Sequence, residues 1–286
     1  MGKIDKEKFS LQHHDVDLFH RSEWDGQGVT STWYVVYRVC VALFMVTGVV
    51  CHFVSTLETQ GMKWFIYMTN QGISFLTIHY IIYAGIVVGK KISSGPTPLG
   101  SLPFLYKFSW GMQTCFTTVA LWITLIYWTA LHPYVVEFNI MKGTWMKMLN
   151  VFLHGVNTIS CVVDMMITAR PVRIHHFYFP CLFGIWFTFF SVIYWAAGGL
   201  GMCMPRCLHL RLDSNMSQVD PSCPINCDKY IYPILDWEDH PGMAAGIVIG
   251  GCVLMPVLQS AWWGVVWLRQ TCKGSRKEEF YKVGVS

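Results

Sequence analysis

Charged side chains are scarce in this chain. Asp, Glu, Lys and Arg make up 13% of its 286 residues, whereas soluble domains carry about 25%. Hydrophobic residues make up 53%. These proportions exclude a soluble globular fold and indicate a membrane protein before any motif is considered. The net charge is only +4 and the basic residues are scattered along the sequence, so we expect no nucleic-acid partner.

Long apolar stretches dominate the sequence instead. A segment of about 20 residues is needed to cross a bilayer as a helix. Trp and Tyr gather near the ends of the apolar stretches, as in an interfacial aromatic belt. The sequence therefore predicts an all-α, polytopic transmembrane bundle. Its six spans are 33–55, 64–89, 108–131, 146–168, 177–197 and 243–268.

The distribution of Lys and Arg predicts the topology. Fourteen of them lie in the terminal segments and the even-numbered connections, against six in the odd-numbered connections. Positive residues favour the cytoplasmic side, so we expect both termini there. The first residues are polar, and we expect no cleavable signal sequence. The predicted parts are an arm at 1–32, a membrane domain at 33–268 and a tail at 269–286.

The fifth connection, residues 198–241, is the only long one, and the same count places it outside the cytoplasm. It contains Asn215-Met216-Ser217, a glycosylation acceptor in that location. Two CxxxC pairs in it also fit the spacing of a zinc site, but an oxidising compartment favours disulfides. Four cysteines allow three pairings, which stay open. The cysteines are Cys203, Cys207, Cys223 and Cys227.

The fourth span carries a polar stripe. Its members lie within an arc of roughly 80° if the helix is regular. Polar groups facing hydrocarbon cost several kcal/mol, so the stripe should turn inward and the other helices should pack around it. The stripe consists of Asn150, His154, Asn157, Cys161, Asp164 and Thr168.

Thr69, in the second span, and His154, in the fourth, lie at similar depths of about 7 and 12 Å from the outer boundary. A histidine that removes the proton of a threonine hydroxyl makes that oxygen a nucleophile. Asn70 or Asn157 could orient the imidazole or stabilise an oxyanion. Intramembrane Thr, Asn and His also serve to hold helices together, so a purely structural role stays open.

Arg38 and Asp164 lie at matching depths in the inner half, about 7 and 6 Å from the cytoplasmic ends of their spans. The pattern predicts a structural ion pair, because either charge alone is costly there. His79 is an alternative partner of Asp164. Residues of this kind also suit a proton-coupled transporter, although no inverted repeat is evident. Arg170 and Arg173 are expected to cap the preceding helix and to hold lipid head groups on the cytoplasmic face, and a role limited to fixing the topology stays open.

Three stretches resemble the Rolling stone family of animal multi-pass membrane proteins. They are DMMITARPVRIHHFYFPCLFG, FSVIYWAAGG and YPILDWEDHPG. The resemblance covers most of the chain, from Trp33 to about Trp267. It implies a multi-pass protein of the plasma membrane with a role in cell fusion, particularly of myoblasts, or in muscle differentiation.

Two shorter stretches resemble the androgen-induced family of intramembrane threonine hydrolases, which cleave fatty-acid esters of hydroxy fatty acids. Tyr67-Met68-Thr69 is similar to that family's threonine element, and His154-Gly155 to its histidine element. The resemblance implies lipid-ester hydrolysis with Thr69 as nucleophile and His154 as base, without metal or cofactor. Membrane lipids are the expected partners, and the extracellular loop could contact another cell. A transporter and a non-enzymatic adhesion component stay open as alternatives.

Overall fold

The computed structural model describes residues 6–93, 102–137, 143–201, 203–205, 225–227 and 229–273. Six helical segments within these ranges are long and apolar enough to cross a membrane, which confirms the predicted all-α, six-span class. Their boundaries differ from the predicted ones by up to eleven residues, most at the end of the first segment. The segments are Thr32–Ile66, Met68–Ile92, Phe104–Leu131, Thr144–Ile167, Ile174–Ala196 and Pro241–Cys272.

Most of the segments are built from more than one element. In the first half of the chain the elements are α1 (Lys6–Phe9), η1 (Asp17–Phe19), α2 (Thr32–Gln60), η2 (Gly61–Ile66), α3 (Met68–Ile92), α4 (Phe104–Ile126), η3 (Tyr127–Leu131) and α5 (His132–Glu137). In the second half they are α6 (Thr144–Val151), η4 (Phe152–Val156), α7 (Asn157–Ile167), η5 (Ile174–Phe177), α8 (Tyr178–Ala196), β1 (Cys203–Pro205), β2 (Ile225–Cys227), η7 (Pro233–Leu235) and α9 (Pro241–Cys272).

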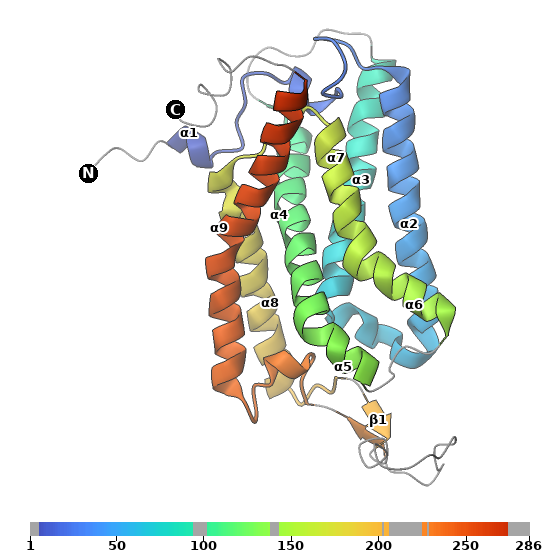
Figure 1. The fold of residues 1–286 in the computed structure, drawn as a ribbon, viewed down its shortest axis with the longest axis vertical. Helices are drawn as coiled ribbons and strands as arrows, with labels where there is room; N and C mark the ends of the chain where they lie inside the picture. Colours follow the sequence, from blue (N-terminus) through green and yellow to red (C-terminus); the bar gives the residue numbers. More distant parts are fainter. Residues whose placement is uncertain are drawn as a thin grey trace, which may run out of the picture.

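The helices run side by side, with α1 and the last turn of α9 at one end and β1 at the other (Figure 1). We call these the terminal end and the loop end. The described segments that lead to both termini therefore share one end of the bundle. Over an apolar 18-residue stretch of each, the second, third and fourth spans have 56%, 50% and 44% of their residues buried. The fourth span therefore shares the interior of the bundle with the second and third.

The connection between the first two spans also differs from the prediction. Trp64 was expected to begin the second span, but it lies in the 3-10 turn η2, where its indole donates to His52 Nδ1 at 2.9 Å. The chain reverses direction here, and side chains from the start of α3 bind the carbonyls of η2. Asn70 Nδ2 donates to Trp64 O at 2.8 Å, and Gln71 Nε2 donates to Phe65 O at 2.7 Å.

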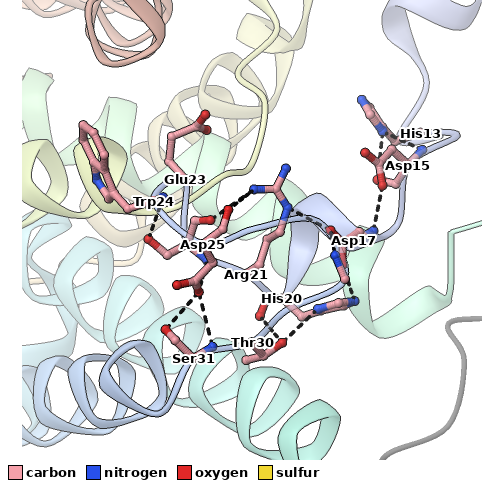
Figure 2. Close-up of polar contacts among 12 residues, drawn as sticks. His13, Asp15, Asp17, His20, Arg21, Glu23, Trp24, Asp25, Thr30 and Ser31 are labelled. Carbon is pink, nitrogen blue, oxygen red and sulfur yellow. Dashed lines mark hydrogen bonds and ion pairs between the residues drawn. The ribbon is translucent and has the colours of Figure 1, made fainter. Parts of the chain in front are cut away.

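The described part of the predicted arm, up to Ser31, packs on the terminal end. Ser22 forms a β-bridge with Thr168, just after α7. Figure 2 shows the internal contacts of the arm, in which Arg21 pairs with Asp17 at 2.8 Å. The carboxylate of Asp25 accepts hydrogen bonds from Ser22 and Ser31. These polar contacts hold the arm in a fixed conformation over the ends of the helices.

Candidate active site

An apolar cleft of about 90 Å³ runs from the loop end toward the middle of the bundle. Side chains of α3, α4, α8 and α9 form its walls, and the turn η7 contributes a further part. Most lining residues are aliphatic or aromatic. Polar groups reach the cleft from only a few positions among its lining residues, including Thr69, Tyr127, His154, Thr188 and Tyr232. A cleft of this composition fits an acyl chain with one polar group.

The structure brings Thr69 and His154 to this one cleft, although they lie far apart in the sequence. Thr69 is the second residue of α3, which begins at Met68, directly after the extended backbone of Tyr67. The Tyr232 hydroxyl accepts a bond from the Thr69 backbone N–H at 3.4 Å. Burial raises the pKa of Tyr232, so its phenol stays protonated at neutral pH.

His154 lies in a π-helical turn, η4, and its neighbour Tyr127 lies in another, η3. The two rings stack, with 3.6 Å between their centroids and 10° between their planes. Trp128 donates to the His154 carbonyl at 2.8 Å, which binds the two π turns together. A π-helical turn holds one residue more than an α-helical turn, and such turns are frequent at functional sites because the extra residue redirects side chains. Here they direct Tyr127 and His154 to the cleft.

The two asparagines expected to support the histidine have other partners. Asn70 holds the turn η2, as described above. Asn157 Oδ1 accepts a hydrogen bond from the Thr158 backbone N–H at 2.6 Å. Within the described residues, His154 Nδ1 is buried and has no hydrogen-bond partner. The cleft therefore contains a histidine whose ring is oriented by stacking on Tyr127 rather than by an amide or a carboxylate.

All six residues of the polar stripe in the fourth span are buried. They do not lie on one regular helix, because η4 interrupts it and Thr168 follows the end of α7 in an extended conformation. This π turn separates the stripe into two parts. His154 faces the cleft, and Asp164 faces the terminal end.

Arg38 and Asp164 form an ion pair. Arg38 Nη1 lies 2.6 Å from Asp164 Oδ1, and both side chains are almost fully buried. The Tyr37 hydroxyl donates to the same carboxylate oxygen at 3.1 Å. His79, the alternative partner, instead contacts the Ser109 hydroxyl at 3.3 Å.

A residue other than Arg170 and Arg173 caps the end of α7. Arg269, from α9, donates to the carbonyls of Met165 and Thr168 at the end of α7. Arg173 binds carbonyls of the arm, and Arg170 turns into the bundle. Sequence reasoning missed Arg269 because it treated the basic residues near the end of the last span only as topology signals.

Sequence reasoning also missed Tyr127 and Tyr232. Tyr127 was interpreted as part of an interfacial aromatic belt, and a sequence has no signal for the π turn that places it beside His154. Tyr232 begins the YPILDWEDHPG stretch, which carried a family resemblance but no role. That resemblance was the available signal that this part of the loop has a specific structure.

Part of the fifth connection lies within the described residues. The antiparallel strands β1 and β2 place Cys203 opposite Cys227. Cys207, Cys223 and Asn215 lie outside the described residues, so the predicted disulfides and glycosylation stay predictions.

Comparison with known proteins identifies the family. The family model described as protein rolling stone matches residues 2–219. The chain belongs to the rolling stone family. It is also 27% identical over 250 residues to protein rolling stone of Drosophila melanogaster, across 83% of this chain and 78% of the fly protein. No solved structure matches the chain significantly. Family membership and the six apolar helices make it a multi-pass membrane protein.

Proposed function

We propose that this rolling stone family member acts at the plasma membrane in cell fusion, particularly of myoblasts, or in muscle differentiation. We further propose that it hydrolyses a lipid ester whose acyl chain occupies the cleft. The observation that carries the proposal is the presence of Thr69 and His154 in the lining of one apolar cleft. The name of the fly relative supports the family, and the resemblance described above links that family to fusion.

The chemistry follows from the functional groups of the cleft. His154 removes the hydroxyl proton of Thr69, and the threonine oxygen forms a bond to the acyl carbon of the ester. The alcohol leaves with that proton, and an acyl-threonine remains. Water, deprotonated by His154, then releases the fatty acid and restores Thr69. Tyr232, bonded to the backbone of Thr69, positions the nucleophile.

A fluorophosphonate probe directed at serine and threonine nucleophiles tests this proposal on the full chain in lipid nanodiscs. The unmodified protein should be labelled, whereas Thr69→Ala and His154→Ala should each reduce the labelling rate at least about 100-fold. Thr188→Ala is the matched control. Thr188 also lines the cleft, but its hydroxyl donates to the Gly184 carbonyl at 2.8 Å. Equal labelling of Thr69→Ala and the unmodified protein would exclude the hydrolase.

The same variants separate enzymatic from adhesive action in a cell-fusion assay. A hydrolase requires Thr69, so Thr69→Ala should fail to support fusion while it still reaches the cell surface. An adhesion component that contacts a partner through the loop requires the fifth connection instead. Retention of fusion by Thr69→Ala, together with its loss in Cys203→Ser, would favour the adhesion component.

The transporter alternative predicts an activity that depends on pH and on Asp164 rather than on Thr69. Asp164 already binds Arg38 and Tyr37, which gives it a structural role in the described arrangement. A proton-coupled transporter would show pH-dependent flux into proteoliposomes that stops in Asp164→Asn, and no probe labelling at Thr69. Labelling at Thr69 without such flux supports the hydrolase.

A further inference from the structure

A second polar site lies at the terminal end, away from the cleft. Arg170 follows α7 and is fully buried, with an exposed fraction of 0%. Its Nη1 atom donates to Ser109 Oγ at 3.0 Å and to Gln113 Oε1 at 3.3 Å. Its guanidinium carbon lies 3.4 Å from the centre of the Tyr83 ring. Hydrogen bonds thus hold the Nη1 edge of the guanidinium, and the Tyr83 ring covers one of its faces.

The other edge of the same guanidinium has donors without acceptors. Arg170 Nε and Nη2 are buried and have no hydrogen-bond partner within the described part of the chain. Nε and Nη2 form the planar fork with which arginine binds carboxylates and other anions. Arg269 uses the corresponding edge for an ion pair, because its Nη2 lies 3.1 Å from Glu23 Oε2. Arg170 has no carboxylate in that position among the described residues.

His79 lies beside this group. Its Nδ1 atom lies 3.3 Å from Ser109 Oγ, the oxygen that accepts a hydrogen bond from Arg170 Nη1. Its Nε2 atom is buried without a hydrogen-bond partner in the described ranges. Ser109 therefore links Arg170 to a second buried polar group.

Among the described residues, Arg170 is the buried arginine of this region that has no carboxylate partner. Arg38 pairs with Asp164, Arg269 with Glu23 and Arg21 with Asp17. The carboxylate of the neighbouring Asp25 binds Ser22 and Ser31 instead. An isolated buried charge is costly, and a guanidinium cannot lose its proton to avoid that cost.

We propose that the free Nε and Nη2 edge of Arg170 binds a chloride ion at the terminal end of the bundle. Chloride supplies the missing negative charge and accepts hydrogen bonds from several directions. The complete burial of Arg170, with Phe19 of the arm 5.5 Å from its guanidinium carbon, favours a monatomic ion over a lipid phosphate. Binding joins the arm, α3, α4 and the segment after α7. Chloride therefore stabilises the folded bundle independently of any hydrolysis.

Thermal unfolding of the full chain in detergent micelles tests the site. The midpoint is measured in sodium chloride, bromide, gluconate, sulfate and phosphate at constant ionic strength. A ligand that binds only the folded state raises the midpoint, by about 3 °C at ten times its dissociation constant. We expect a saturable rise with chloride and bromide only. No rise with either halide would overturn the proposal, and a rise with sulfate or phosphate alone would identify an oxyanion site instead.

Single substitutions show which residue binds the halide. Arg170→Gln should lose the dependence on halide, and Arg170→Lys, which keeps the charge but not the fork, should need at least tenfold more chloride for the same shift. Arg173→Gln is the matched control, because Arg173 binds the carbonyls of Ser10 and Gln12 and should leave the halide effect unchanged. Broadening of the ³⁵Cl resonance provides a direct readout. Broadening that persists in Arg170→Gln and Arg170→Lys alike would place the ion elsewhere and refute this site.

Discussion

The two ends of the bundle bury polar groups in different ways. At the terminal end, Asp164 binds Arg38 and Tyr37, and Glu23 faces the cations of Arg269 and Lys273. At the loop end, His154 borders an apolar cleft and has a buried Nδ1 atom without a partner in the described residues. Paired groups fix the arrangement of helices, and the Arg170 donors that are unpaired within the described chain are enclosed among them. The comparison indicates that the terminal end mainly maintains the fold, whereas the loop end has the cleft in which the proposed hydrolysis takes place.

The largest expected effect comes from Asp164→Asn. The substitution leaves the fully buried guanidinium of Arg38 without its carboxylate. Removing one partner of a buried pair typically costs about 3–5 kcal/mol. The midpoint of thermal unfolding in detergent should fall accordingly. Replacing both partners, as in Arg38→Met with Asp164→Leu, should restore most of the loss. A double variant as unstable as the single one would contradict this account.

Gly48→Ala should disturb the loop-end half through packing. A methyl group at Gly48 would lie 2.1 Å from the nearest ring atom of Phe152, which belongs to the π turn of His154. Overpacking of this kind costs about 1–3 kcal/mol. We expect a lower midpoint and slower probe labelling at Thr69. Gly85→Ala is the control, since a methyl group there meets no atom within 4 Å. Equal effects of the two substitutions would argue against a specific contact with Phe152.

Acidification should loosen the terminal end. Burial, together with His14 and Arg173, lowers the pKa of His13 from 6.5 to about 4. A histidine with a lower pKa in the folded state contributes stability above pH 6.5, and that contribution is lost as the pH falls toward 4. Hydrogen exchange of the arm should therefore accelerate over this range. His13→Gln should weaken the pH dependence, and the exposed His240→Gln should not. An identical pH profile for His13→Gln would assign the effect to other groups.

The smallest effect is expected for Glu238→Gln. Glu238 Oε1 lies 2.6 Å from Lys229 Nζ, as close as the buried pair at the terminal end, but both side chains are largely exposed to solvent. Water and salt screen such pairs. We expect no measurable change in the unfolding midpoint at physiological salt. A clear decrease would mean that the loop after β2 contributes more to stability than its exposure indicates.

The sequence was a good guide to the spans and a poor guide to where they begin and end. Apolar length alone located six helices, because a bilayer requires long apolar segments. It could not place Trp64 in a turn, because the tertiary contact with His52 decides that position. The depths of Arg38 and Asp164 suggested their contact, since depth along a helix follows from residue count. The partner of His79 did not follow, because depth does not specify which helices are neighbours.

In the candidate site, too, the sequence predicted some residues and tertiary contacts decided the others. Thr69 and His154 could be singled out because each is a reactive polar residue within an apolar segment. Tyr127 and Tyr232 could not, since one depends on two π turns and the other on the return of a loop to the start of α3.

By itself, the sequence determined that this chain enters a membrane as six helices and that its few polar residues turn inward. Both follow from the cost of exposing polar groups to hydrocarbon, which composition and spacing record directly. Only the tertiary structure decided which polar groups meet. It gave Asp164 a cation and brought His154 to the same cleft as Thr69, because helix packing and local changes of helical pitch set the direction of each side chain.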